Sequence, residues 1–273
     1  MVKWDGHTHS QFCRHGSGEK TSLMIEKAIG LGFEKYSITE HAPMPSQVIP
    51  EPEMRADFGL TWDELDDYFA HLEDLKKRYR NKIELLAGLE IDYLVGMEDY
   101  SKDLLDRCQP YLDDVIVSLH FIKDNEKLLP IDYSPETFTN LIDYFGTVDK
   151  VHLAYWETMK ELVANGLPGL KNKRIGHIAL IDKFSKIYPP TISDYRTSTF
   201  FKDVFSLIKK YGWSIDFDVA GLNYDSCQEV YLPDYMLHWC KQLDIDLVYG
   251  SDAHSVKAVG NFYSLYETMI GHN

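Results

Sequence analysis

The sequence predicts an α/β fold: a distorted (β/α)7 barrel, similar to a TIM barrel, that forms a single domain over residues 1–273. Short apolar segments alternate with segments of helical periodicity, and seven such units follow one another. Alternation of this kind predicts a parallel sheet with right-handed crossovers. The length of 273 residues also suits one barrel, which commonly has about 250 residues. A doubly wound open sheet is the alternative, because periodicity alone does not exclude it.

The first four strands are expected in the N-terminal half, at residues 2–4, 35–39, 83–89 and 114–119. Helices are expected at residues 21–30, from Thr61 onward and near residues 100–108. Thr61 with Glu64 three residues later is a capping-box pattern, and apolar residues follow it at helical spacing. The proline-rich stretch 43–52 is typical of a loop.

The remaining three strands are expected at residues 174–178, 214–220 and 246–249. A polar insertion follows the fourth strand, and helical segments are then expected from residue 134 to 164. Ser134 is the expected N-cap, since Pro135 suits the first helical position. Further helices are expected near residues 199–210, near residues 233–242 and from about Val256 onward.

Composition limits the classes of partner. The chain has 43 acidic and 28 basic residues, which gives a net charge of −15, so most of its surface would repel a polyanion and we expect no nucleic-acid partner. The four cysteines form no C-x-x-C pair, which favours a reducing cytoplasmic setting. No signal region and no run of about 18 apolar residues is present, so we expect no membrane association. The sequence leaves the oligomeric state open.

Histidines and carboxylates gather at the predicted strand ends. Seven of the 11 histidines lie at or just beyond the carboxyl end of a strand, together with one glutamate and one aspartate. These residues are His7, His9, His15, His41, Glu90, His120, His177, Asp252 and His254. In a parallel barrel these ends form one mouth. Neutral imidazoles and carboxylates suit zinc, manganese and iron, and nine ligands are too many for one tetrahedral ion, so we infer two or three metal ions.

A structural explanation competes for each single histidine, because an isolated one is more often a core or surface residue. His71 and His238 are expected on helices, the former on a solvated face, and His272 is terminal. His152 competes with His177, although it lies in helical sequence. The combination of His7-Thr8-His9, Asp252-Ala253-His254 and Glu40-His41 with two strand-end histidines is much harder to explain by chance. No G-x-x-x-x-G-K, G-x-S-x-G or H-E-x-x-H motif supports nucleotide-dependent transfer, serine hydrolysis or a zincin.

Six phrases carry a family resemblance: DGHTHS, ITEHAP, GLEIDY, SLHFI, RIGHI and YGSDAHS. They resemble the polymerase-and-histidinol-phosphatase (PHP) family, and the phrases FCRHG, IDYS and AGL are similar to its monofunctional histidinol-phosphate phosphatases. The resemblance implies a distorted (β/α)7 barrel with three divalent metal ions, variously zinc, manganese or iron. It implies that the first ion is held by His7, His9, Glu90 and Asp252, the second by Glu90, His120 and His177, and the third by His15, His41 and His254. The segment 223–225 lacks the basic residue that the family pattern places there.

The resulting hypothesis is the hydrolysis of L-histidinol phosphate to L-histidinol and phosphate in histidine biosynthesis, by a metal-bridged hydroxide that attacks phosphorus in line. Glu90 and Asp252 are the expected catalytic residues. Arg14 and Arg196 are candidate phosphate clamps, and Glu40 could receive the substrate amine or support His41.

Two alternatives stay open. One is another PHP activity, that of a phosphodiesterase or single-strand exonuclease, which the acidic balance and the lack of a basic aromatic groove disfavour. The other is a metal-stabilised binding module without turnover, which the complete set of nine ligand positions disfavours.

Overall fold

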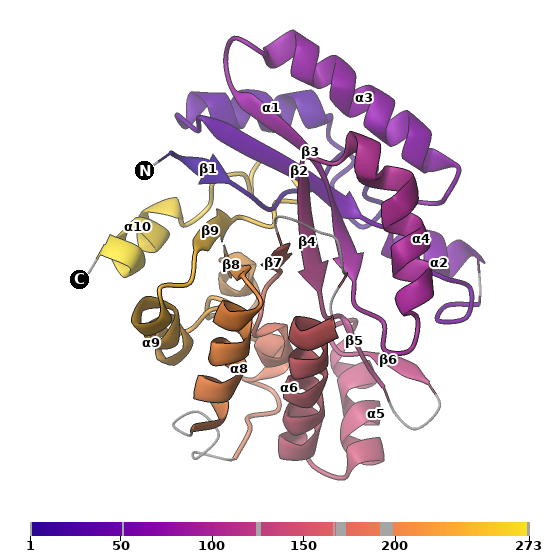
Figure 1. Ribbon diagram of the computed structural model, residues 1–273, viewed down its shortest axis with the longest axis vertical. Helices are drawn as coiled ribbons and strands as arrows, with labels where there is room; N and C mark the ends of the chain where they lie inside the picture. Colours follow the sequence, from indigo (N-terminus) through magenta and orange to yellow (C-terminus); the bar gives the residue numbers. More distant parts are fainter. Residues whose placement is uncertain are drawn as a thin grey trace.

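Seven parallel strands form the centre of the molecule (Figure 1). The computed structural model describes residues 2–50, 52–123, 127–165, 167, 173–191 and 199–271. The strands of the sheet, in spatial order, are β1 (Trp4–Asp5), β2 (Lys35–His41), β3 (Glu84–Asp92), β4 (Asp114–Ser118), β7 (Lys173–Ile175), β8 (Trp213–Asp218) and β9 (Leu247–Gly250). Every neighbouring pair is parallel. All seven expected strands are confirmed, within a few residues at their ends.

The first and last strands meet, so the sheet is a nearly closed barrel. Gly6 N donates to Tyr249 O at 2.8 Å. Beyond the strand ends, Thr8 and Ala253 form a parallel bridge, and the flanking backbone hydrogen bonds are Asp252 N to His7 O (2.9 Å) and His9 N to Ala253 O (3.0 Å). We call the paired segments 6–9 and 249–253 the seam. The seam excludes the open doubly wound sheet.

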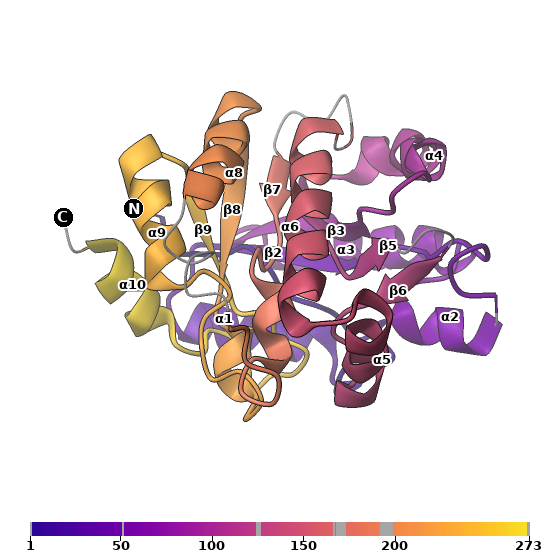
Figure 2. The ribbon, with the colours of Figure 1, turned by 90° about the horizontal axis from the view of Figure 1, so that it is seen from below.

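Helices cover the outside of the barrel, with α1 and α3 beside β1–β3 and α6, α8 and α9 beside β7–β9 (Figures 1 and 2). Their bounds are α1 Thr21–Gly30, α2 Pro52–Phe58, α3 Glu64–Tyr79, α4 Glu98–Cys108, α5 Pro135–Phe145, α6 Val148–Asn165, α8 Thr199–Lys210, α9 Asp234–Leu243 and α10 Tyr263–Gly271. The apolar residues expected at helical spacing on α3 are buried, among them Leu65, Phe69 and Leu72. Their burial attaches the helix to the barrel.

Two capping patterns have different outcomes. Ser134 caps α5 as expected, because its hydroxyl accepts from Thr137 N while Thr137 Oγ1 accepts from Ser134 N. Gly146, with a φ of 91°, then ends α5 before α6 begins. The expected start of α3 at Thr61 is wrong. The Glu64 carboxylate accepts from Thr61 N (2.8 Å), but the helix itself begins at Glu64.

The last helix also begins later than expected, at Tyr263 rather than near Val256. Gly260 and Phe262 have φ angles of 72° and 54°, and left-handed backbone interrupts a helix. The preceding residues form turns that continue the loop after β9.

The polar insertion after β4 contains a hairpin, β5 (Phe121–Lys123) paired antiparallel with β6 (Leu128–Pro130). It packs on the loop between β2 and α3 through a small apolar cluster separate from the main core, built on Met44, Ile49, Leu94 and Phe121 with Phe58 against it. This second cluster fixes α2 beside the barrel mouth.

A buried ion pair fills the opposite end of the barrel. Arg174 donates to Asp114 Oδ2 at 2.8 Å and to Gly6 O at 2.5 Å, and its guanidinium lies 5.1 Å from the centre of the Trp4 ring. A buried charge needs such partners to offset its lost hydration. Among the helices in the described part of the chain, none is both long and apolar enough to cross a membrane.

Candidate metal centre

All nine side chains singled out as ligands come together at the carboxyl ends of the strands. They reach this mouth from the loop after β1, from β2 and β3, and from the segments after β4, β7 and β9. Most of them border one cavity of about 790 Å³. The rule that one face of a parallel barrel collects the strand-end residues therefore holds here.

Glu90, near the end of β3, lies at the centre of the cluster. Its Oε1 is 2.8 Å from His177 Nε2 and 3.7 Å from His120 Nε2. Its Oε2 is 3.1 Å from His41 Nδ1 and 3.3 Å from His7 Nε2. Burial would raise the pKa of Glu90, but His41 and His7 outweigh it and hold the pKa well below its usual range. Glu90 is thus a carboxylate with one oxygen toward His120 and His177 and the other toward His7 and His41, an arrangement that suits a bridging ligand.

The first imidazole group lies at the seam. Asp252 Oδ1 is 2.9 Å from His9 Nε2 and 3.6 Å from His7 Nε2. Asp252 has a φ of 48° and His177 a φ of 24°. Left-handed backbone at such residues is strained, and strain of this kind clusters at functional sites. The backbone is therefore bent to bring these two donors to the cavity.

The second group, with His120 and His177, depends on a close approach of two strands. Ser118 Oγ donates to Glu90 Oε1 at 2.5 Å. A Cβ at position 176 would overlap that hydroxyl, so Gly176 is required for β7 to place His177 beside Glu90.

The third group consists of His15, His41 and His254. His15 Nε2 lies 3.2 Å from both His41 Nε2 and His254 Nε2. The other ring nitrogens of His15 and His254 face backbone carbonyls, of Asp57 (2.8 Å) and Asp252 (2.9 Å). Those carbonyls can only accept, so they place the proton on Nδ1 and leave Nε2 as a lone pair.

The charge state of this third group suits a cation. Burial, with nearby histidines, lowers the pKa of His254 to about 3 and also lowers the pKa of His15. Both rings are therefore neutral at neutral pH. Neutral imidazole lone pairs that face one another at 3.2 Å repel, and a divalent ion between them would satisfy both.

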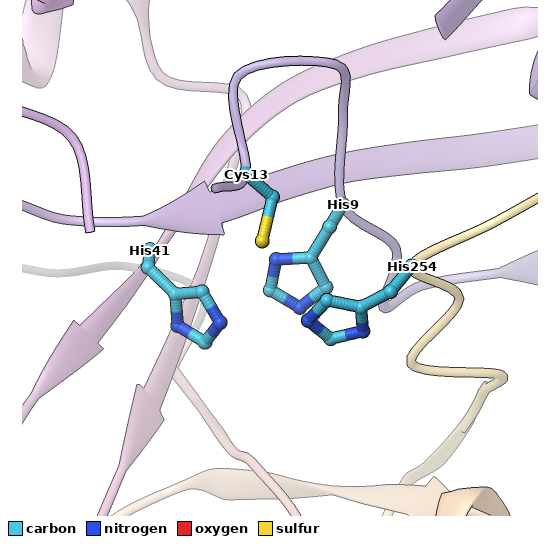
Figure 3. A group of neighbouring side chains, drawn as sticks. All are labelled: His9, Cys13, His41 and His254. Atoms are coloured by element: carbon cyan, nitrogen blue, oxygen red, sulfur yellow. The ribbon is translucent and has the colours of Figure 1, made fainter. Parts of the chain in front are cut away.

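Figure 3 shows a further side chain beside these rings, Cys13, whose sulfur points from the loop after β1 toward the histidines. The His9 ring lies between those of His41 and His254, with centroid distances of 4.3 and 4.0 Å. Burial and the charge of Glu40 raise the pKa of the Cys13 thiol. Cys13 therefore packs against the rings as a neutral thiol.

Several ligand-position histidines are oriented by carboxylates behind them. His7 Nδ1 donates to Asp216 Oδ2 at 2.5 Å, and Asp218 Oδ2 is 3.6 Å from the same nitrogen. His120 Nδ1 donates to Asp92 Oδ1 at 2.7 Å. Such partners fix the tautomer and direct Nε2 toward a metal.

Sequence analysis missed Asp92, Asp216 and Asp218, although a signal was present. Asp92 follows Glu90 by two residues on β3, and Asp216 and Asp218 are spaced in the same way at the end of β8. Side chains at i and i+2 of a strand share a face, so a carboxylate two positions from a ligand can point to the same interior.

Carboxylates beside the rings also raise the pKa values of two of the histidines. Burial would lower the pKa of His9, but Asp252 and Glu40 outweigh it and raise the pKa to about 9. Burial is likewise outweighed at His120, where Asp92 raises the pKa to about 10. Without metal these two rings carry protons at neutral pH, so a metal ion must displace them.

The sequence profile of the PHP domain matches residues 5–217. The chain belongs to the PHP domain family. Among curated relatives, this PHP protein is 36% identical to a histidinol-phosphatase of Bacillus subtilis strain 168 over 270 residues, which covers 97% of this chain and 98% of that protein.

Two solved structures share the fold. A candidate histidinol phosphatase from Listeria monocytogenes has a TM-score of 0.91 and 35% identity, with 97% of this chain and 100% of that chain covered. A histidinol phosphate phosphatase from Lactococcus lactis, solved with zinc, L-histidinol and phosphate, has a TM-score of 0.70 and 19% identity, with 98% and 94% covered. The second likeness concerns the fold alone.

Glu40 does not lie where a substrate residue of this PHP protein was expected. It is only 1% exposed. Its carboxylate accepts from Ser10 N (2.9 Å) and Ser10 Oγ (2.6 Å) and faces His9 Nδ1 at 3.2 Å. Glu40 is therefore placed to orient His9, rather than to receive a substrate amine or to support the His41 ring.

The two candidate phosphate clamps have different outcomes. Arg14 borders the cavity, but its guanidinium forms an ion pair with Glu64 Oε1 at 2.6 Å. Arg196 lies outside the described residues.

A cation that sequence analysis missed also borders the cavity. Lys183 Nζ lies 2.9 Å from Asp132 Oδ2 and 5.1 Å from the centre of the Tyr224 ring. It brings a positive charge to the segment 223–225, which has none of its own. The available signal was its position, six residues after His177.

The four remaining histidines lie outside the cluster or outside the described residues. His152 is buried on α6, with Nδ1 3.8 Å from Asp182 Oδ1, so it does not compete with His177. His238 is exposed on α9, as expected. The solvated position expected for His71 is wrong, because this side chain is half-buried against Phe12. His272 lies outside the described residues.

Proposed function

We propose that this PHP protein is a metal-dependent phosphomonoesterase that hydrolyses L-histidinol phosphate to L-histidinol and phosphate, a step of histidine biosynthesis. The observation that carries the proposal is the gathering of eight imidazole and carboxylate side chains around Glu90 at the barrel mouth, where seven of the nine border one cavity. The Bacillus subtilis relative, named a histidinol-phosphatase, supports the choice of substrate.

The proposed ligands divide among three divalent ions. Glu90 would be shared by the first two, with His7, His9 and Asp252 holding one and His120 and His177 the other. His15, His41 and His254 hold the third. Zinc, manganese and iron all suit this donor set, and the zinc in the Lactococcus lactis protein supports zinc as one of them.

Divalent ions at such a centre activate water and offset the negative charge of a phosphoryl group. Glu90 and Asp252 are the proposed catalytic residues, because their oxygens lie among the imidazoles of the first two groups. Lys183 is a phosphate contact in this proposal, since its ammonium borders the cavity and can exchange Asp132 for a phosphate oxygen. Arg14 stays a candidate that would have to leave Glu64.

The proposed partner is a small phosphomonoester rather than a nucleic acid. The net charge of −15 disfavours a polyanionic substrate, and this also argues against the exonuclease alternative. The proposed location is the cytoplasm, since Cys13, Cys108, Cys227 and Cys240 are buried free thiols.

The test is hydrolysis by protein stripped of metal and reconstituted separately with zinc, manganese or iron. Phosphate release from histidinol phosphate should exceed cleavage of bis(p-nitrophenyl) phosphate and of single-stranded DNA. Faster cleavage of a diester would favour the phosphodiesterase alternative. Absence of turnover on every ester, with metal bound, would favour the binding module.

The ligand set needs its own measurement. His120→Ala should lower bound metal, counted by mass spectrometry, together with activity. His238→Ala is the matched control, because His238 is exposed on α9 and is not among the residues that line the cavity. Full metal content and full turnover in His120→Ala would remove His120 from the ligand set.

A further inference from the structure

Helix α2 connects the metal centre to an aromatic part of the cavity wall. Its Asp57 carbonyl accepts from His15 Nδ1 at 2.8 Å. The next residue, Phe58, ends the helix and borders the cavity. Its ring also packs on Phe121 of the β5–β6 hairpin, with centroids 5.9 Å apart. One short segment therefore positions both a proposed ligand and a ring that faces the substrate cavity.

Phe58 is stacked on Tyr133, with centroids 5.5 Å apart and ring planes 16° apart. Tyr133 also borders the cavity, yet 59% of it is exposed. Large aromatic side chains usually bury more of their surface than this. An exposed ring in a preformed stack at a cavity mouth can accept a further flat ring with little loss of conformational entropy.

Negative charge accompanies both rings. Asp57 directly precedes Phe58, Asp132 directly precedes Tyr133, and all four residues border the cavity. A π face attracts cations, and the two carboxylates add to this attraction. Lys183, which pairs with Asp132, offers the opposite charge to an anionic group. The cavity thus combines a site for a planar ring and a cation with a site for an anion.

We infer that the stacked pair Phe58–Tyr133, flanked by Asp57 and Asp132, is the subsite for the alcohol half of the substrate and selects an alcohol that carries both a planar ring and a positive charge. The inference rests on the proposed function, because it assigns specificity within the same cavity. Phe58 and Tyr133 are specificity-determining residues, and the metal centre acts on the phosphate whichever alcohol carries it.

The test compares histidinol phosphate with 2-aminoethyl phosphate, which has an ammonium group and no ring. Phe58→Leu and Tyr133→Leu keep apolar volume and remove a π face. Each should lower the ratio of the two kcat/KM values about tenfold, mainly through the KM for histidinol phosphate. Phe58→Trp keeps a π face and should therefore leave the ratio of the two kcat/KM values close to that of the unmodified protein.

Tyr111→Leu is the matched control. Tyr111 is likewise an exposed tyrosine stacked on a phenylalanine, Phe69, with centroids 5.2 Å apart, and it lies outside the cavity lining. The ratio of the two kcat/KM values in Tyr111→Leu should equal that of the unmodified protein. Metal content of every variant is counted, because α2 holds His15. An equal loss for both esters, with or without loss of metal, would show a structural role and overturn the inference.

Calorimetry separates this inference from the proposed function. L-Histidinol should bind to the metal-loaded protein about ten times more weakly after Phe58→Leu. If the protein binds L-histidinol in this ring-dependent way but releases no phosphate from its ester, the proposed function fails and the subsite stands. If L-histidinol binds equally well to both proteins, or to neither, the subsite fails even where histidinol phosphate is hydrolysed.

Discussion

Asp216→Asn tests whether the carboxylate behind His7 controls metal binding. Asp216 Oδ2 and His7 Nδ1 are 2.5 Å apart, and both side chains are fully buried. The amide keeps the size of the carboxylate and can still accept from Nδ1. It removes the negative charge that makes the imidazole a stronger donor to a metal. The substitution is therefore a test of charge more than of shape.

The expected loss follows from the role of such partners. Replacing a carboxylate that orients a ligating histidine lowers metal affinity about 10- to 100-fold, which corresponds to about 1.4–2.7 kcal/mol. The upper part of this range is expected here, because a buried hydrogen bond to a charged group is stronger than an exposed one. Burial and the charge of Asp252 raise the pKa of Asp218, whose Oδ2 is 3.6 Å from the same nitrogen, so Asp218 replaces the lost charge only in part.

The assay is competition with a chromophoric chelator at pH 7.5, with bound metal counted at each point. Asp216→Asn should weaken one ion selectively, and added metal should restore turnover. Asp5→Asn is the control: this buried carboxyl accepts from Ser251 N, Ser251 Oγ and the backbone of His7 rather than from a histidine ring. Burial raises the pKa of Asp5 to about 7, so at the assay pH the amide replaces a carboxyl that is partly protonated. Unchanged affinity in Asp216→Asn would refute the reasoning, as would an equal loss in Asp5→Asn.

Four further predictions follow from the charges. The pKa values of His9 and His120 are raised to about 9 and about 10, so metal affinity should rise about tenfold per pH unit for each displaced proton. Chelator competition between pH 6 and 9 measures this, and a constant affinity would contradict it. The same two histidines stabilise the metal-free fold, fully below the ordinary histidine pKa of 6.5, and this stabilisation is lost as pH rises through 9–10. Urea unfolding in EDTA should therefore show a lower free energy of unfolding at pH 10 than at pH 6. Lys183→Met should lower kcat/KM for the phosphomonoester about 10- to 100-fold, Lys183→Arg should retain most activity, and equal rates in both variants would exclude a role of the charge. Arg174→Met leaves Asp114 buried without its cation and should lower the free energy of unfolding by about 3–5 kcal/mol. The urea midpoint of the metal-free protein measures this, and an unchanged midpoint would contradict it.

The barrel could be predicted because it depends on local periodicity. Short apolar segments and helical segments alternate along the chain, and all seven sheet strands lie where they were expected, within a few residues. Local signals failed where backbone geometry decides the outcome. The start of α10 is displaced by left-handed residues, and nothing in the identity of Phe262 announces its φ of 54°.

The candidate ligands could be placed at one mouth for a similar reason, since the ends of parallel strands share an edge. Residues whose role depends on long-range pairing could not. Arg14 pairs with Glu64, fifty positions later, and Glu40 contacts His9 across strands. Neither pairing has a local pattern. Asp216 acts on His7 from 209 positions away, so only the folded barrel connects them.

The seam determines where the chain could be circularly permuted. Figure 1 shows both termini on the same side of the barrel, while the backbone hydrogen bonds between residues 6–9 and 249–253 fasten the first and last strands. A linker between the ends of this sequence, with a new chain break in an exposed loop, would keep these hydrogen bonds. A new chain break at Thr8 or Ala253 would remove the hydrogen bonds that close the barrel. It would also separate the proposed metal ligands that lie beside them.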